Sequence, residues 1–168
     1  MADEPTRDQF REAASRFATG LVVVACVVDG HPHAMTASSF VPVSLDPLLA
    51  MVSVQRGTRF HEAALSVTEW AVSVLAADAV DAARWFATKG RPLADQFADV
   101  AHSPGVVTGA PVITGSLAAL ECRTVDVHRA GDHDLLVGPV LSVAVTEASP
   151  PPLLYHRRGY RLLGPSAP

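Results

Sequence analysis

The Asp29-Gly30 pair between two strand-like segments is the feature that most constrains the fold. The segment before it, residues 21–28, is apolar and β-branched on both faces, which predicts a fully buried strand. Asp-Gly is a strong signal for a two-residue hairpin turn, so the chain is expected to return as a strand over residues 31–37. Strands joined by so short a turn run in opposite directions, and the fold is therefore expected to contain an antiparallel sheet.

The remaining segments predict more strands and a few helices. Thr6 and Gln9 have the form of a capping box, and apolar residues follow at helical spacing up to Gly20, which predicts a first helix with one buried stripe. Further helices are predicted after the cap residue Thr58 and from Asp78 towards residues 89–90, with a helical turn within 92–100. Strands are expected over residues 48–54, 69–75, 117–128, 134–145 and 153–163, with an irregular connection over 102–115 and a bulge or bend at 138–139.

This order of elements lacks the strand-helix-strand alternation of a doubly wound fold. We therefore expect a mainly β fold, an antiparallel barrel with flanking helices, formed by a single domain over residues 1–168. Residues 1–5 and 164–168 are expected to be flexible tails.

Composition excludes several classes of protein. Hydrophobic residues make up 49% and charged residues 18%, so we expect an apolar face that a second subunit covers. The net charge of −4 argues against nucleic acid as a partner. Cys26 and Cys122 lie far apart in apolar runs, which is typical of reduced core residues. The charged start MADEPTRDQFRE and the absence of a long apolar run favour an intracellular protein with no signal peptide and no membrane span.

A run of short polar residues leaves the strand that ends near Ala37. Thr36, Ser38 and Ser39 offer hydroxyl and backbone N–H groups at one place, which suits a phosphate group or the edge of a flat heteroaromatic ring. The alternative is a Ser/Thr-rich turn whose hydroxyl groups cap their own backbone. Dinucleotide-binding GxGxxG, P-loop, GxSxG and HExxH motifs are missing from the sequence.

The histidines leave two further hypotheses open. His31 and His33 have the spacing of metal ligands on one side of a strand, but Pro32 lies between them and no third ligand is near, so two solvent-facing edge histidines are favoured. His133 follows a Gly-Asp pair in a predicted turn, from which it either projects into a cleft or lies at the surface. Tyr, His and Arg residues over 155–160 suit either a phosphorylated cofactor or a subunit contact.

Five segments of the sequence are informative when taken together. They are FREAASRFATGLVVV, HAMTASSFVPVSLDPLLAMVSV, WAVSVLAADAVDAARWFA, GSLAALECRTVDVHRAGDHDLLVGPVLSV and PLLYHRRGYRLL. These segments resemble the flavin reductase family with the FMN-binding split β-barrel. They cover nearly the whole chain in one order. The resemblance implies an antiparallel barrel of Greek-key type and a homodimer. Two departures are Leu48 after Pro47, where members often have a second proline, and the longer stretch WFATKGRPLADQF.

The resemblance also assigns site residues. The segment like MTASSF runs along the flavin, Thr58-Arg59 is similar to the part that meets the flavin phosphate, and Lys89 is similar to a phosphate-side or adenine-side contact. His133 is implied to face the nicotinamide as the catalytic residue. The implied cofactor-binding residues are Thr36, Ala37, Ser38, Ser39, Ser53, Val54, Gln55, Thr58, Arg59, Phe86, Ala87, Lys89 and Tyr160, with no metal ligands.

The function implied is that of an NAD(P)H:flavin oxidoreductase in the cytoplasm. It would pass a hydride from NADH or NADPH to FMN or FAD and supply the reduced flavin to a separate flavin-dependent monooxygenase. A barrel that binds flavin or haem without turnover is the alternative, and a metal-dependent enzyme using His31 and His33 is a third hypothesis.

Overall fold

The computed structural model describes residues 4–148 and 150–164, so most of both predicted tails lies outside the described residues. The helices are α1 (Arg7–Ser15), α2 (Arg59–Ser66) and α3 (Val80–Ala87). The strands are β1 (Thr19–Gly20), β2 (Val22–Val28), β3 (His31–Ala37), β4 (Phe40–Leu45), β5 (Leu48–Gln55), β6 (Glu69–Val74), β7 (His102–Pro104), β8 (Pro111–Ile113), β9 (Ala118–Arg123), β10 (Asp126–Ala130), β11 (His133–Val145), β12 (Leu154–His156) and β13 (Gly159–Arg161). None of these helices is long and apolar enough to cross a membrane.

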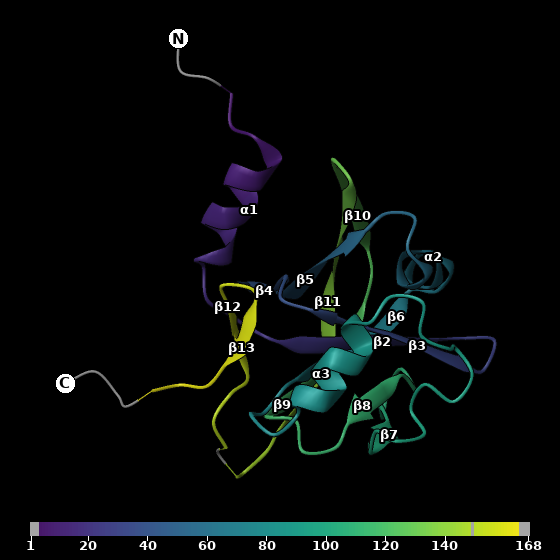
Figure 1. Ribbon diagram of the computed structural model, residues 1–168. Helices are drawn as coiled ribbons and strands as arrows, with labels where there is room; N and C mark the ends of the chain where they lie inside the picture. The colour runs from purple at the N-terminus through teal and green to yellow at the C-terminus, as the bar shows by residue number, and fades with distance from the viewer. Residues whose placement is uncertain (1–3, 149, 165–168) are drawn as a thin grey trace.

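The main sheet confirms the predicted antiparallel β fold. It has eight strands in the order β3-β2-β6-β9-β11-β5-β4, with β10 paired to β11 beside this path (Figure 1). The β2–β3 hairpin turns at the predicted Asp29-Gly30, and both residues have positive φ. The two ends of the strand order, β3 and β4, are consecutive in the sequence and separated only by Ser38 and Ser39. The sheet therefore opens where these two residues lie.

Both faces of β2 are buried, as its unbroken apolar sequence predicts. Val22, Val24 and Cys26 pack into a cluster with α2 and residues of β5, β6 and β11. Val23 and Ala25 pack on the opposite face with residues of α3 and of the segment that follows it. The alternation of one strand between two apolar clusters fixes the register of the β2–β3 hairpin, because a shift by one residue would exchange the two faces.

Helix α1 begins at the predicted capping box but has no buried residue. The Thr6 side chain accepts a hydrogen bond from the Gln9 backbone N–H, and the Gln9 side-chain oxygen accepts one from the Thr6 backbone N–H. Phe10 is 69% exposed and Phe17, just after the helix, 76% exposed. Figure 1 shows α1 standing apart from the sheets. The prediction of a stripe buried within this chain is therefore wrong.

Several predicted boundaries differ from the structure. The expected strand over 117–128 is two strands, because the chain turns a corner at 124–125 so that β9 and β10 pair with different parts of β11. The expected last strand is a hairpin, β12–β13, whose turn residues Arg157 and Arg158 both have positive φ. Residues 92–100 form turns instead of a helical turn, the short β7–β8 pair lies within the predicted irregular connection, and β4 was not expected.

The edge of β3 is covered by side chains instead of another strand. Arg91 and Gln96, on the segment after α3, donate hydrogen bonds to the backbone carbonyls of Ala34 and Pro32. The Trp85 indole N–H donates to the Gln96 carbonyl oxygen at 2.7 Å. The segment after α3 is thereby held against the same strand that leads to Ser38.

Candidate active site

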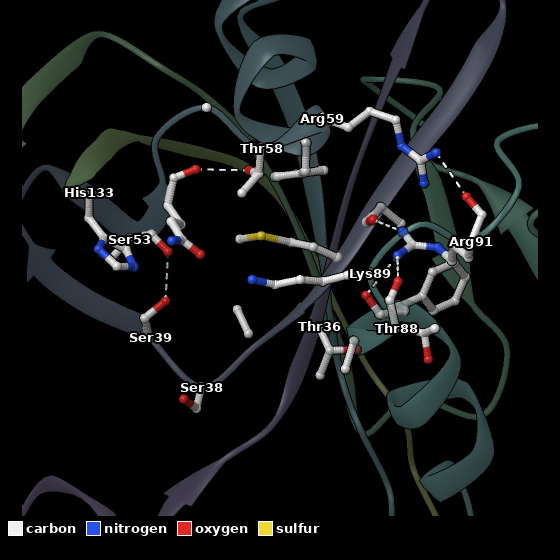
Figure 2. Close-up of a pocket in the computed structure, with 18 of the residues that line it drawn as sticks. Thr36, Ser38, Ser39, Ser53, Thr58, Arg59, Thr88, Lys89, Arg91 and His133 are labelled. Atoms are coloured by element: carbon white, nitrogen blue, oxygen red, sulfur yellow. Dashed lines mark hydrogen bonds between the residues drawn. The ribbon is translucent and has the colours of Figure 1, made fainter. Parts of the chain in front are cut away.

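A pocket of about 770 Å³ lies where the main sheet opens. One wall is the end of β3 with Ser38 and Ser39, and another is the end of β5 with the start of β11. The start of α2 and the segment after α3 complete it (Figure 2). The lining residues are Ala34, Met35, Thr36, Ala37, Ser38, Ser39, Ser53, Gln55, Arg56, Gly57, Thr58, Arg59, Phe60, Phe86, Ala87, Thr88, Lys89, Gly90, Arg91 and His133.

The hydroxyl groups of the pocket divide into two kinds. Thr36 Oγ1 donates to the Ala83 carbonyl at 2.7 Å, which ties β3 to α3, and Ser39 Oγ donates to the Ser53 carbonyl at 2.9 Å. These two hydroxyl groups bind carbonyl groups 47 and 14 residues away in the sequence, and not their own backbone as the alternative interpretation of the polar run expected. Ser38 and Ser53 make no side-chain hydrogen bond within the described residues, and both line the pocket. Their hydroxyl groups are available to a ligand.

The opposite side of the pocket is cationic. Arg59 and Lys89 line it together with Arg91, and none of the described residues that line the pocket is acidic. Arg59 Nη1 donates to the Arg91 carbonyl at 2.9 Å, which holds the segment after α3 against the start of α2. Thr58 caps α2 as predicted, accepting a hydrogen bond from the His61 N–H at 3.3 Å. In a chain with a net charge of −4, this concentration of positive charge favours an anionic ligand.

Arg91 is a buried cation, and one of its three guanidinium nitrogens makes no hydrogen bond to the described residues. Only 9% of the residue is exposed, and its two terminal nitrogens donate to carbonyls of Phe86, Thr88 and Ala34 and to the Gln96 side chain. Its Nε is buried without a hydrogen-bond partner among the described residues. Burial, with a smaller effect of the nearby Arg59 charge, lowers the pKa of Arg91 to about 10. The guanidinium thus stays charged near neutral pH.

His133 lies at the edge of the pocket as the first residue of β11. It is paired with Gln55 of β5, and its Nδ1 is 2.9 Å from Asp132 Oδ1. The hydrogen bond with His133, and next its charge, hold the pKa of Asp132 below its usual value. The Arg56 backbone N–H donates to the Asp132 carbonyl at 3.0 Å, so the turn that carries His133 is tied to the end of β5.

A buried network supports this edge of the pocket. Asp134 Oδ2 is 2.8 Å from His61 Nε2, and its Oδ1 accepts from Arg56 Nη1 at 2.9 Å. The hydrogen bond with His61 is the largest cause that lowers the pKa of Asp134; burial opposes it, and Arg56 lowers it further. No sequence motif joins these residues. The only sequence signal is an acidic residue two positions before the buried Leu136, on the inward side of its strand.

Two of the predicted site residues lie away from the pocket. The Val54 side chain is fully buried in the core, because it alternates with Ser53 and Gln55, which face the pocket. Tyr160 packs against Tyr155, with ring centroids 5.8 Å apart, and Arg84 lies over its ring. All other predicted site residues line the pocket, including Ala37, Phe86 and Ala87. Met35, Arg56 and Arg91 line it as well and were not predicted.

The two histidines of β3 differ from each other. His31 is exposed, whereas His33 Nδ1 is buried without a partner among the described residues, so the expectation that both face solvent is wrong for His33. Burial, followed by the charges of Arg59, His31 and Arg91, lowers the pKa of His33. The described residues contain no group of three or more His, Cys, Asp or Glu side chains placed to hold a metal ion.

Comparison with known proteins identifies the family. The model of the flavin reductase like domain matches residues 14–164. An NADH:riboflavin 5'-phosphate oxidoreductase of Streptomyces pristinaespiralis is 38% identical over 99% of this chain and 97% of its own length. The structure of the Streptomyces globisporus NADH:FAD oxidoreductase SgcE6 in complex with NAD and FAD fragments superposes with a TM-score of 0.91 at 34% identity, covering 100% of this chain and 99% of that one. BorF, the flavin reductase component of a bacterial two-component tryptophan halogenase, has a TM-score of 0.89 at 39% identity over 96% of this chain and 100% of its own. The chain therefore belongs to the flavin reductase family.

Proposed function

We propose that this protein is an NADH-dependent flavin reductase that transfers a hydride from the nicotinamide to FMN or FAD. The observation that carries the proposal is the pocket at the sheet opening. Cationic side chains lie on one side of it and the free hydroxyl groups of Ser38 and Ser53 on the other, without an acidic residue among those described. Relatives named as NADH-dependent FMN and FAD reductases support NADH as the donor over NADPH.

The residues of the pocket fit a flavin nucleotide. Arg59 suits a phosphate group, and Ser38, Ser53 and Gln55 offer hydrogen bonds to the polar edge of a ring. Apolar side chains such as Met35 provide surface for the flat body of the ring. A flavin bound in this way would accept the hydride directly at N5 when the nicotinamide C4 lies within about 3 to 3.5 Å.

Hydride transfer between the two cofactors requires little acid–base catalysis by residues of the protein. Its residues bind and orient two flat molecules, which agrees with a pocket rich in Ser, Thr and Ala. His133 would orient the nicotinamide and exclude water from one ring face, and its contact with Asp132 fixes the imidazole for that role. The network of Asp134, His61 and Arg56 supports this edge from inside.

The test is an anaerobic assay with purified protein, free FMN or FAD, and NADH or NADPH. We expect bleaching of the flavin absorbance with NADH. A protein that bleaches neither flavin with either nucleotide is not a flavin reductase. The alternative of a binding barrel makes the opposite prediction, namely a flavin or haem that stays bound through gel filtration and remains oxidised when NADH is added.

We also propose that the protein is a homodimer. α1 has no buried residue, and Phe10 and Phe17 expose 69% and 76% of their surfaces. β4 exposes Val41, Val43 and Leu45 in the same way. Apolar residues gathered on a helix and an edge strand are typical of surfaces that a second copy covers.

The proposed destination of the reduced flavin is a separate monooxygenase. Relatives include the reductase subunit of a flavin-dependent monooxygenase in Mycobacterium tuberculosis and a styrene monooxygenase flavin reductase. A cytoplasmic location is part of the proposal and agrees with two free, buried cysteines, Cys26 and Cys122, in place of a disulfide.

A further inference from the structure

Lys89 is the only lysine in the sequence, and it lies in the pocket. It lies two residues after the end of α3, between Thr88 and Gly90. Figure 2 shows its side chain leaving the side of Arg59 and Arg91 and extending across the middle of the pocket. Its ammonium group is directed towards the side that carries Ser39, Ser53 and His133.

The backbone around Lys89 is fixed. The Thr88 backbone N–H donates to the Trp85 carbonyl at 3.1 Å, and the Thr88 hydroxyl donates to the Arg84 carbonyl at 2.9 Å. The Thr88 carbonyl in turn accepts from Arg91 Nη1 at 3.2 Å. Gly90 has a φ of +74°, a conformation suited to glycine, which turns the chain immediately after Lys89. The start of the lysine side chain is therefore directed into the pocket by its neighbours.

Lys89 differs from the other cations of the pocket in having no partner among the described residues. Arg56 is paired with the buried Asp134, and Arg59 donates to the Arg91 carbonyl. The two terminal nitrogens of Arg91 donate hydrogen bonds to four acceptors. Lys89 has neither an ion pair nor a hydrogen bond within the described part of the chain. Its ammonium group is therefore available to contact a ligand in the pocket.

We propose that the Lys89 ammonium group lies against the N1–C2=O edge of a bound flavin and stabilises the negative charge that reaches this edge during reduction. This inference rests on the proposed function. The hydride carries two electrons and a proton from nicotinamide C4 to flavin N5, the nicotinamide leaves oxidised, and the added negative charge spreads to N1 and C2=O. A fixed positive charge at that edge favours the reduced state and the transfer itself. The direction of the side chain, away from Arg59 and Arg91, separates this role from the phosphate-side contact that the family resemblance implied.

The first experiment compares Lys89→Met and Lys89→Arg with the wild type, each with FMN and with riboflavin, which lacks the phosphate. We expect Lys89→Met to lower the midpoint potential of the bound flavin and to slow single-turnover hydride transfer by about tenfold with both flavins. Lys89→Arg should retain most of both properties. Arg123→Met, which removes a positive charge outside the pocket, is the matched control and should behave like the wild type.

One outcome of this comparison would overturn the proposal. If Lys89→Met weakens binding of FMN but not of riboflavin, and leaves the potential unchanged, Lys89 contacts the phosphate instead. A wild type that binds no flavin or does not bleach it would contradict the proposed function itself. The two failures are therefore distinguishable.

The second experiment uses the single lysine and needs no turnover. An acetylating reagent can modify one lysine and the N-terminal amine, so mass spectrometry of peptides reports the reactivity of Lys89 directly. We expect riboflavin and FMN to protect Lys89 equally at saturation, with the N-terminal amine as internal reference. Protection by FMN without protection by saturating riboflavin would contradict a contact at the ring edge.

Discussion

Asp134 is a carboxylate placed among the core residues of β5 and β11 and held there by its hydrogen bonds. Because His61 and Arg56 favour its charged form, its pKa in the folded protein lies below the value in the unfolded chain. The stabilisation is therefore present above the unfolded pKa, which is about 3.9 for aspartate, and is lost as the pH falls through the folded pKa. Acid should weaken this edge of the pocket through Asp134.

The substitution Asp134→Asn tests whether the charged carboxylate stabilises the folded protein. The substitution keeps the shape but removes the charge that pairs with Arg56, so the melting temperature at neutral pH should fall. The difference from the wild type should shrink as the pH falls below about 4, where the carboxylate of the unfolded chain becomes protonated, and should disappear below the lower pKa of the folded state. Thermal unfolding followed by circular dichroism between pH 3 and 8 measures both effects. Asp126→Asn on the exposed β10 is the control, and a constant difference for Asp134→Asn at every pH would contradict the assignment.

Arg59→Ala should weaken FMN binding by about 1.5 to 3 kcal/mol, the usual contribution of a hydrogen bond to a charged group. The physical reason is the loss of a phosphate contact at the cationic side of the pocket. Calorimetric titration with FMN measures the change. Riboflavin affinity should stay unchanged, and an equal loss for both flavins would place the Arg59 effect elsewhere.

The sequence pointed to most of the pocket, and its failures there have particular causes. The hydroxyl run and Thr58 could be predicted from local sequence, since the run lies at the end of a strand and Thr58 immediately precedes a helix. Val54 was assigned to the site although the period of two that brings Ser53 and Gln55 to the pocket turns Val54 inward. Arg91 was missed because the contact that ties it to β3, with the Ala34 carbonyl, spans 57 residues of the sequence, and no local pattern shows such a contact.

At the scale of elements, the central strands were predictable and the corners were not. β2 and β3 were clear because an apolar run and an Asp-Gly turn are local signals. The segment over β9 and β10 alternates continuously, so nothing local marks the corner at 124–125. That corner exists because β11, 13 residues long, pairs first with β10 and then with β9. The register shift between Val140 and Ser142 lies just after the predicted bend.

Gly138 is the element-scale position that we expect to be most sensitive. A methyl group there would overlap the Arg123 carbonyl at the corner between β9 and β10. Gly138→Ala should therefore lower the free energy of unfolding by about 1 to 3 kcal/mol, as for other overpacked sites. Chemical denaturation measures it. Gly20→Ala, where nothing lies within 4 Å of the added carbon, is the matched control, and equal effects would contradict this account of the corner.

At the scale of the whole molecule, the exposed apolar surface predicts association. Replacing Phe10 and Phe17 by Glu should convert the proposed dimer to a monomer, because two charges would have to be buried in the contact. Light scattering coupled to gel filtration measures the mass. Arg11→Glu on the same helix is the control for a change of charge alone, and a wild type that elutes as a monomer would refute the proposal. That residues 1–168 form one domain stays a prediction.

The side chains that cover the edge of β3 have a second role besides forming a wall of the pocket. Arg91 and Gln96 occupy carbonyl groups that an incoming strand from another molecule would otherwise use. Truncating either side chain would expose unpaired carbonyl groups at the edge of β3. A strand of another molecule would then be able to pair with this edge. Variants of this segment that lose solubility should therefore also lose ligand affinity. A screen for soluble protein would thus also select for an intact pocket wall.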